Sequence, residues 1–268
     1  MIDPSLQDIL IAFGATAAAG LATVAGSLLV FTAPPNPRLL AFGLAFAGGA
    51  MVYVSLAEIL QKSIIAFDTA WGEPWGFTGG TLAFLGGLCL IALIDLLIPN
   101  PHTKLSVDEM EASQKSQDYI KRVGLMAALA ITAHNFPEGL ATFFAMLDSP
   151  ELGLPLAVAI ALHNIPEGIS IAVPVYVATN NKGLAIGASF LSGLAEPVGA
   201  AIGYGLLAPF LSDAVFGAVF GIIAGVMVFL ALDELLPAAK RYAQGHETVY
   251  GLISGMAILA VSLILFRI

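Results

Sequence analysis

Two copies of one polar motif interrupt otherwise apolar stretches of this chain, at residues 134–139 and 163–168. Each copy reads His-Asn-x-Pro-Glu-Gly, and each lies near the middle of a stretch that is long enough to cross a bilayer. Ionisable side chains at that depth are costly and mark ion pathways or binding sites. We therefore expect the two copies to face each other and to bind divalent metal ions. Their polar members are His134, Asn135, Glu138, His163, Asn164 and Glu167.

Helical spacing brings the polar side chains of each copy together. Residues i and i+4 project from one face of a helix, with i+3 beside them. His134 and Glu138 therefore point together, with Asn135 next to Glu138, and the second copy repeats this geometry. Pro137 and Pro166 lack an N–H group and clash with the carbonyl four residues earlier, which predicts a kink in each helix.

The mixture of nitrogen and oxygen ligands indicates which ions such a site accepts. Imidazole suits zinc and its first-row neighbours, and carboxylate and carbonyl oxygens suit harder ions. The set predicts Zn²⁺, with Fe²⁺, Mn²⁺, Co²⁺ and Cd²⁺ as further cargo and no catalytic cofactor. Six ligands exceed what one tetrahedral ion takes, so two adjacent ions bridged by Glu138 and Glu167 are expected. Glu196, which precedes Pro197 within another apolar stretch, is expected to complete the more oxygen-rich position.

Composition predicts an integral membrane protein in contact with the lipid bilayer. Of the 268 residues, 58% are hydrophobic and only 11% are charged, whereas a soluble protein carries about 25% charged residues. The net charge of −9 and the lack of a basic patch argue against nucleic acid as a partner. The single Cys89 indicates no disulfide framework, and the first four residues lack the basic region of a cleaved signal peptide.

The apolar stretches predict an all-α fold with eight transmembrane helices. The expected spans are 6–32, 38–62, 76–98, 122–147, 153–179, 184–210, 212–236 and 249–267. Clusters of Pro and Gly separate several of them. The one sizeable polar stretch, about 99–121, is expected to be a cytoplasmic loop within a single transmembrane domain that covers residues 1–268.

The Lys and Arg residues predict the orientation, because they are retained on the cytoplasmic side. If the N-terminus is external, Lys62 and Arg267 are the two external cations of the ten. The internal ones are Arg38, Lys104, Lys115, Lys121, Arg122, Lys182, Lys240 and Arg241. Both termini are therefore expected on the external, periplasmic side of the cytoplasmic membrane, and the two motif-bearing helices are expected to be antiparallel.

The chain also resembles itself. Residues 51–60 align with 227–236, and 20–26 align with 193–199. Under the predicted orientation the matched helices run in opposite directions, as in the inverted repeats of secondary transporters, which bind their substrates near the membrane midplane. We therefore predict a 3+2+3 arrangement with the fourth and fifth helices at its centre.

Several other polar residues allow two interpretations. Glu58, Asp233 and Glu234 lie nearer the predicted helix ends, where they are either solvated terminal charges or markers of the entrance and the exit. Thr142 and Ser170 follow the two motif glutamates by about one turn. They either line the path or bond back to their own helices, and the second interpretation is favoured.

These residues resemble the ZIP (Zrt/Irt-like) family of divalent metal transporters, and within it the bacterial ZupT-type branch. The paired motif and the sequence Ser-Gly-Leu-Ala-Glu-Pro at 192–197 carry the resemblance, which extends over essentially the whole chain. It implies metal uptake into the cytoplasm by a homodimer. The ligand set that it implies for the first ion is His134, Glu138, His163 and Glu167. The set for the second is Asn135, Glu138, Asn164, Glu167 and Glu196.

The loop departs from that family. Many members have a histidine-rich cytoplasmic loop. Here, His102 is the one histidine of residues 99–121, a stretch that also contains acidic residues. Zinc sensing by the loop is therefore not indicated, and broad ion selectivity is favoured.

Two rival functions follow from the same residues. An intramembrane zinc-dependent hydrolase also uses His and Glu ligands, but it needs an open coordination position and rigid ligand helices. The kinking prolines and the use of every polar group as a ligand argue against it. A membrane metal sensor would need a sizeable soluble signalling domain, which this sequence lacks. We therefore predict a metal uptake permease that works by alternating access, with no indication of direct ATP use.

Overall fold

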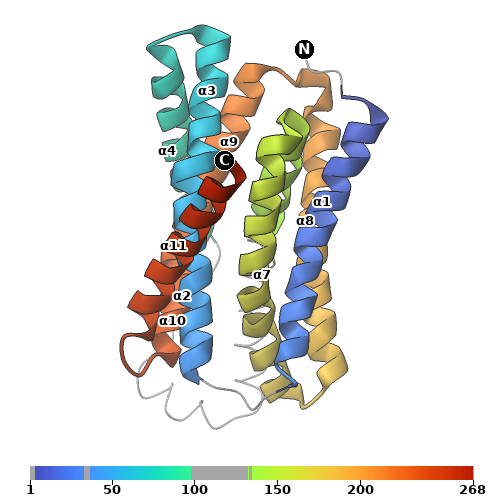
Figure 1. Cartoon of the computed structure of the whole chain (residues 1–268), viewed down its shortest axis with the longest axis vertical. Coiled ribbons are helices and arrows are strands. Elements are labelled where there is room, and N and C mark those ends of the chain that lie inside the picture. Colours follow the sequence, from blue (N-terminus) through green and yellow to red (C-terminus); the bar gives the residue numbers. More distant parts are fainter. Residues whose placement is uncertain (1–3, 33–36, 98–131, 133–134, 268) are drawn as a thin grey trace.

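Helices account for the secondary structure throughout the described part of the chain. The computed structural model describes residues 4–32, 37–97, 132 and 135–267 (Figure 1). The α-helices are α1 (Leu6–Leu29), α2 (Pro37–Val54), α3 (Leu60–Trp71), α4 (Trp75–Leu97), the segment 135–148, α7 (Pro150–Thr179), α8 (Lys182–Leu207), α9 (Asp213–Leu230), α10 (Leu236–Tyr242) and α11 (Glu247–Arg267). Two π-helical segments, η1 (Ser55–Ile59) and η3 (Ala231–Leu235), and a 3₁₀ turn, η2 (Ala208–Phe210), complete the described elements.

Seven helical spans within the described residues are long and apolar enough to cross a membrane. Large apolar side chains such as Leu96 and Phe77 are exposed on the outside of the bundle, where lipid would cover them. The prediction of an all-α integral membrane protein is therefore confirmed. Most of the predicted span 122–147, and the loop predicted at 99–121, lie outside the described residues.

Local chemistry explains where several helices begin and end. The Ser5 hydroxyl accepts a bond from the backbone N–H of Asp8, and the Asp8 carboxylate accepts one from the N–H of Ser5, which forms a capping box for α1. Asn181 caps α8, because its side-chain oxygen accepts a bond from the N–H of Leu184 at 3.1 Å. Asn180, with φ of 51°, ends α7 in the left-handed conformation.

The second transmembrane helix is longer than the sequence suggested. We expected it to end at residue 62, but α2, η1 and α3 form one continuous span from Pro37 to Trp71. Lys62 and Ser63 lie inside this span, and each of them has a partner on a neighbouring helix. Lys62 pairs with Asp148, and the Ser63 hydroxyl donates to the carbonyl of Gly217 at 2.6 Å. The helix ends only at Gly72, whose φ is 75°.

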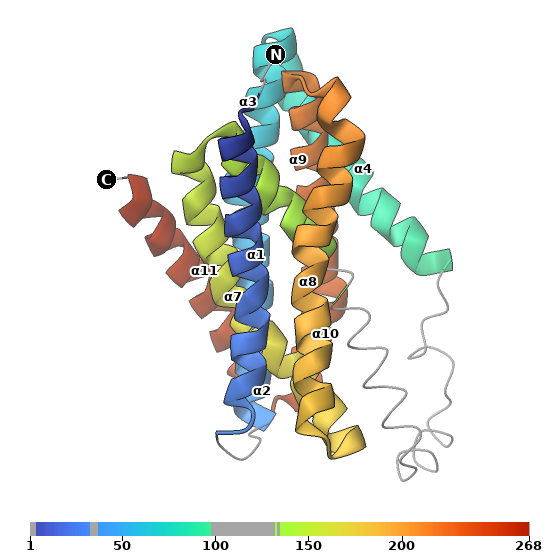
Figure 2. The ribbon, with the colours of Figure 1, turned by 90° about the vertical axis from the view of Figure 1, so that its right-hand side faces the viewer.

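Matching features occur at the positions that the internal alignment pairs. The π-helical segments η1 and η3 occupy equivalent places in the aligned stretches 51–60 and 227–236. α1 and α8 run in opposite directions, as do α2 and α9, and α4 and α11 (Figure 2). Both observations support the inverted repeat, which stays a prediction.

Glycine contacts follow the same pairing. A methyl group added at Gly49 would collide with the carbonyl of Leu252, and one added at Gly225 would collide with the carbonyl of Phe84. The two glycines each lie two residues before the aligned stretches and so correspond to each other. The contact of α2 with α11 therefore resembles that of α9 with α4. Small residues let helices approach closely in a membrane, where packing drives their association.

The described helices form two groups. In the first group, α1 packs against α7 and α8, and the segment 135–148 lies beside α8 through Gly139, Gly199 and Gly203. In the second group, α2 packs against α11, and α3 and α4 pack against α9. α2 and α7 provide a direct contact between the groups. The polar motif residues belong to the first group.

Candidate metal site

A buried hydrogen bond joins the two copies of the motif. The imidazole Nε2 of His163 on α7 lies 3.0 Å from Oε1 of Glu138 on the segment 135–148. His163 is 1% exposed and Glu138 is fully buried. The chain therefore brings the two copies together as expected, although His134 lies outside the described residues.

The two motif asparagines connect the segment 135–148 and α7 to α1 and α8. The amide of Asn164 donates to the carbonyl of Ala19 at 2.9 Å and to the carboxylate of Glu196 at 2.5 Å. The amide of Asn135 donates to the carbonyl and to the hydroxyl of Ser192, at 3.1 and 3.3 Å. Glu196 thus joins the motif residues, as the sequence predicted, and the amide N–H groups are satisfied.

Only some oxygens of the cluster have a hydrogen-bond partner in the described part of the chain. Six buried acceptor atoms have no hydrogen-bond partner among the described residues. They are Oδ1 of Asn135, Oε2 of Glu138, Oδ1 of Asn164, both carboxylate oxygens of Glu167 and Oε2 of Glu196. Such atoms are rare in folded proteins because each loses its hydration without compensation. Their concentration at one place indicates a site for a cation.

The motif glycines allow the helices to meet at this place. A methyl group on Gly139 would collide with the carbonyl of Glu196, and one on Gly168 would collide with the carbonyl of Thr23. The segment 135–148 can therefore lie against α8, and α7 against α1. Because these contacts involve backbone atoms, the helices that carry the polar residues approach each other closely.

Sequence reasoning missed three groups around the cluster: the hydroxyl of Ser192, the carbonyl of Ala19 and the buried Thr23. Ser192 precedes Glu196 by four residues and therefore shares its helix face. Thr23 occupies the position that the internal alignment pairs with Glu196, and its hydroxyl has no partner among the described residues. Both signals are present in the sequence, whereas the contact with Ala19 depends on how α1 and α7 cross.

The flanking polar residues differ partly from expectation. Ser170 donates to the carbonyl of Pro166 at 2.8 Å, which confirms the favoured interpretation. The prediction for Thr142 is wrong, because its buried hydroxyl has no hydrogen-bond partner among the described residues. Glu58 is 4% exposed and lies inside the long second span, so it is not a solvated helix end. The kinks at Pro137 and Pro166 stay predictions, and α7 is helical from Pro150 to Thr179.

The polar side chains bond to one another in this arrangement. Among the described residues, no three His, Cys, Asp or Glu side chains stand close enough together to form a metal-binding group.

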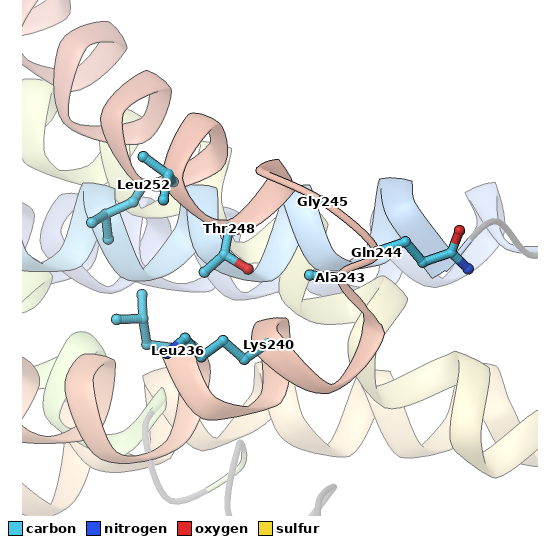
Figure 3. A pocket seen from close by; sticks show the side chains of 8 residues that line it. Leu236, Lys240, Ala243, Gln244, Gly245, Thr248 and Leu252 are labelled. Carbon is cyan, nitrogen blue, oxygen red and sulfur yellow. The ribbon is translucent and has the colours of Figure 1, made fainter.

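A hollow of about 480 Å³ opens elsewhere, between the ends of α10 and α11. Leu236 and Lys240 face Thr248 and Leu252 across it (Figure 3), and no member of the polar cluster lines it.

Fold and site together define a multi-pass membrane protein with a buried polar cluster inside its helical bundle. A sequence model described as ZIP zinc transporter matches residues 100–263. Zinc transporter ZupT of Xanthomonas axonopodis pv. citri (strain 306) is 70% identical over 268 residues, which cover 100% of this chain and 98% of the relative. Zinc transporter ZupT of Neisseria meningitidis serogroup B (strain ATCC BAA-335 / MC58) is 63% identical, with 100% of both chains covered. A more distant relative of the same name, from Lysinibacillus sphaericus (strain C3-41), is 50% identical over 264 residues, which cover 96% of this chain and 98% of the relative.

The chain therefore belongs to the ZIP zinc transporter family. This membership confirms the predicted resemblance and makes the protein a transporter rather than an enzyme. The alternative of an intramembrane zinc-dependent hydrolase is set aside accordingly.

Proposed function

We propose that the protein carries Zn²⁺ across the cytoplasmic membrane into the cell and that the polar cluster is its transport site. Six buried acceptor oxygens, for which the described residues provide no donor, carry this proposal. A hydrogen-bond donor is enough to satisfy an amide oxygen. Ionised carboxylates that are gathered in a low-dielectric interior need positive charge as well. A divalent cation supplies that charge and accepts lone pairs from several oxygens at once.

Electrostatics favour a cation between the three glutamates. Glu138 lies within electrostatic range of both Glu167 and Glu196, and all three side chains are fully buried. Their mutual repulsion decreases when a metal ion binds among them. The imidazole of His163, which bonds Glu138 in this structure, adds the nitrogen ligand that zinc prefers.

The two-ion arrangement is part of the proposal. His134, Glu138, His163 and Glu167 would hold one ion, and Asn135, Asn164 and Glu196, together with Glu138 and Glu167, would hold the other. The amide oxygens of both asparagines have no hydrogen-bond donor within the described ranges, which supports an oxygen-rich second position. Because nitrogen and oxygen ligands are mixed and thiolates are absent from the set, Fe²⁺, Mn²⁺, Co²⁺ and Cd²⁺ are proposed as further cargo.

Alternating access follows from the burial of the site. The ligand side chains of known position are 0–1% exposed, so that an ion reaches them only after helices move. The two helix groups provide the moving parts, since the ligands lie on the first group and the second group supports it.

The charges favour the proposed orientation. Arg38, Lys182, Lys240 and Arg241 begin or end helices at the end of the bundle where α1 ends (Figure 2). We propose that this end is cytoplasmic and that both termini are external. The resemblance to the family adds a homodimer to the proposal.

Zinc uptake into proteoliposomes tests the function. Radiolabelled zinc is supplied outside, and the intact protein is compared with the double variant Glu138→Ala plus Glu167→Ala. We expect uptake by the variant to fall to the level of protein-free liposomes. The matched control, Glu73→Ala plus Glu151→Ala, removes two exposed acids and should retain uptake. Equal uptake by the intact protein and the Glu138/Glu167 variant would contradict the proposal.

Anomalous diffraction at the zinc edge tests the two-ion arrangement separately. Two peaks bridged by Glu138 and Glu167 are expected in crystals grown with zinc. A single ion that touches neither Asn135 nor Asn164 would refute it.

A further inference from the structure

A buried lysine lies far from the metal site and takes no part in the proposed function. Lys62 on α3 is 7% exposed, and its ammonium Nζ lies 3.4 Å from Oδ2 of Asp148. The same nitrogen lies 5.8 Å from the ring centroid of Phe220. A buried ammonium needs such partners because its charge is poorly solvated in the protein interior.

The ion pair connects the two helix groups. Asp148 ends the segment 135–148, the helix that carries Glu138. Lys62 and Phe220 belong to the second group, on α3 and α9. Any motion that separates the groups at this end of the bundle must therefore break the contact between Lys62 and Asp148.

Packed aromatic rings lie between this ion pair and the metal site. The rings of Phe143 and Phe144 follow Glu138 by five and six residues, which corresponds to roughly 8–9 Å along a helix. Phe143 packs on Phe13 of α1, with centroids 4.6 Å apart, and Phe144 packs edge-on against Phe216 of α9 at 5.7 Å. The rings thus join both helix groups between this end of the bundle and Glu138.

We propose that the ion pair between Lys62 and Asp148 is a latch that keeps the external side of the transporter closed. The proposal rests on the transport function and on the orientation argued above. In the outward-facing state the latch is open, the aromatic rings separate, and metal ions reach the site. When the groups close again, Lys62 returns to Asp148 and seals the external end.

The latch breaks the symmetry between the two halves of the chain. If the alignment of 51–60 with 227–236 is extended by two residues, Lys62 pairs with Ala238 on α10, which carries no charge. The corresponding place at the opposite end therefore lacks this ion pair, and the latch stabilises the externally closed state selectively. Its contribution is moderate, because Asp148 remains 39% exposed and water screens the pair.

Thiol labelling tests the latch without measuring transport. Cys89 is replaced by Ala, and Ala141→Cys places one thiol in a fully buried position one turn from Glu138. A membrane-impermeant maleimide is added from the external side. We expect Lys62→Met and Asp148→Asn to label faster, by about threefold or more, since a partly exposed pair shifts a two-state equilibrium by that order.

Two controls distinguish the latch from general loosening. Lys62→Arg retains the charge and should label as slowly as the parent protein. Glu73→Gln removes an exposed acid from the turn between α3 and α4 and should leave labelling unchanged. Equal labelling of Lys62→Met, Asp148→Asn and the parent protein would overturn the proposal.

Reversible cross-linking tests the same contact during transport. The variant Lys62→Cys plus Asp148→Cys is treated with a short bifunctional thiol reagent that a reductant can cleave. Zinc uptake should be lost on linking and recovered on reduction. Uptake at the unlinked rate by a fully linked sample would overturn the latch. Absence of zinc uptake in the parent protein would instead contradict the proposed function, and labelling would still decide on the latch.

Discussion

Gly20 on α1 and Gly193 on α8 face each other so closely that a methyl group on either would collide with the carbonyl of the other. The internal alignment pairs these two residues, so the contact is reciprocal, as expected for two residues on either side of a symmetry axis. The amide of Asn164 bonds next to this crossing, to the carbonyl of Ala19 and to Glu196. The crossing therefore positions part of the proposed metal site.

This crossing is expected to tolerate no larger residue. Gly20→Ala should lower stability by about 1–3 kcal/mol, the usual cost of overpacking, because two backbones must separate. Thermal unfolding of the detergent-solubilised protein measures the effect. Gly14→Ala is the control, because a methyl group there would meet nothing within 4 Å. Alanine in a helix interior should stabilise that position by about 0.5–1 kcal/mol. Equal melting temperatures of the two variants would contradict the assigned contact.

Zinc should protect the folded protein through the glutamate cluster. A ligand at a hundredfold excess over its Kd stabilises the native state by about 2.7 kcal/mol, which raises the melting temperature. Glu167→Gln retains the size of the side chain and removes its charge, so most of the zinc-dependent shift should be lost. Glu151→Gln changes an exposed acid of the same helix and should keep the shift. An unchanged shift in Glu167→Gln would argue against Glu167 as a ligand.

The buried hydroxyl of Thr142 has no hydrogen-bond partner in the described part of the chain, which predicts an unusual stabilising substitution. Thr142→Val replaces the buried hydroxyl by a methyl group of similar size, and an unsatisfied buried polar group costs about 1–3 kcal/mol. The melting temperature should therefore stay the same or rise. Ser170→Ala removes a formed hydrogen bond of 2.8 Å and should lower it slightly. If Thr142→Val melts lower than the parent protein, the hydroxyl has a partner in solution.

The aromatic rings above the site should contribute strongly to stability. Phe143 is fully buried and contacts the rings of Phe13, Phe144 and Tyr204. Phe143→Ala should destabilise the protein by about 3–5 kcal/mol, as large-to-small substitutions do in a packed interior. Phe77→Ala, at a side chain that is 68% exposed on α4, is the control and should have little effect. Similar losses in both variants would place Phe143 outside the packed interior.

The helices and most of the candidate site were predictable because their signals are local. A stretch of about 20 apolar residues marks a membrane span wherever it occurs, and the cost of polar groups at depth singled out both motif copies and Glu196. The expected end of the second span at residue 62 was wrong because an ion pair to Asp148 holds the buried Lys62 inside the protein. That partner lies 86 residues away in the sequence, and no local pattern identifies it.

By itself, the sequence determined the membrane class and the family, since these depend on composition, spacing and residue identity. It also predicted the ligand types. The tertiary structure decided which partners those residues meet. It placed His163 against Glu138 and joined Asn164 to Ala19 and Glu196. It also left buried oxygens of the candidate site without donors from the part of the chain that the structure describes. The physical reason is that satisfaction of a buried polar group depends on how distant helices cross, and only packing in three dimensions determines those crossings.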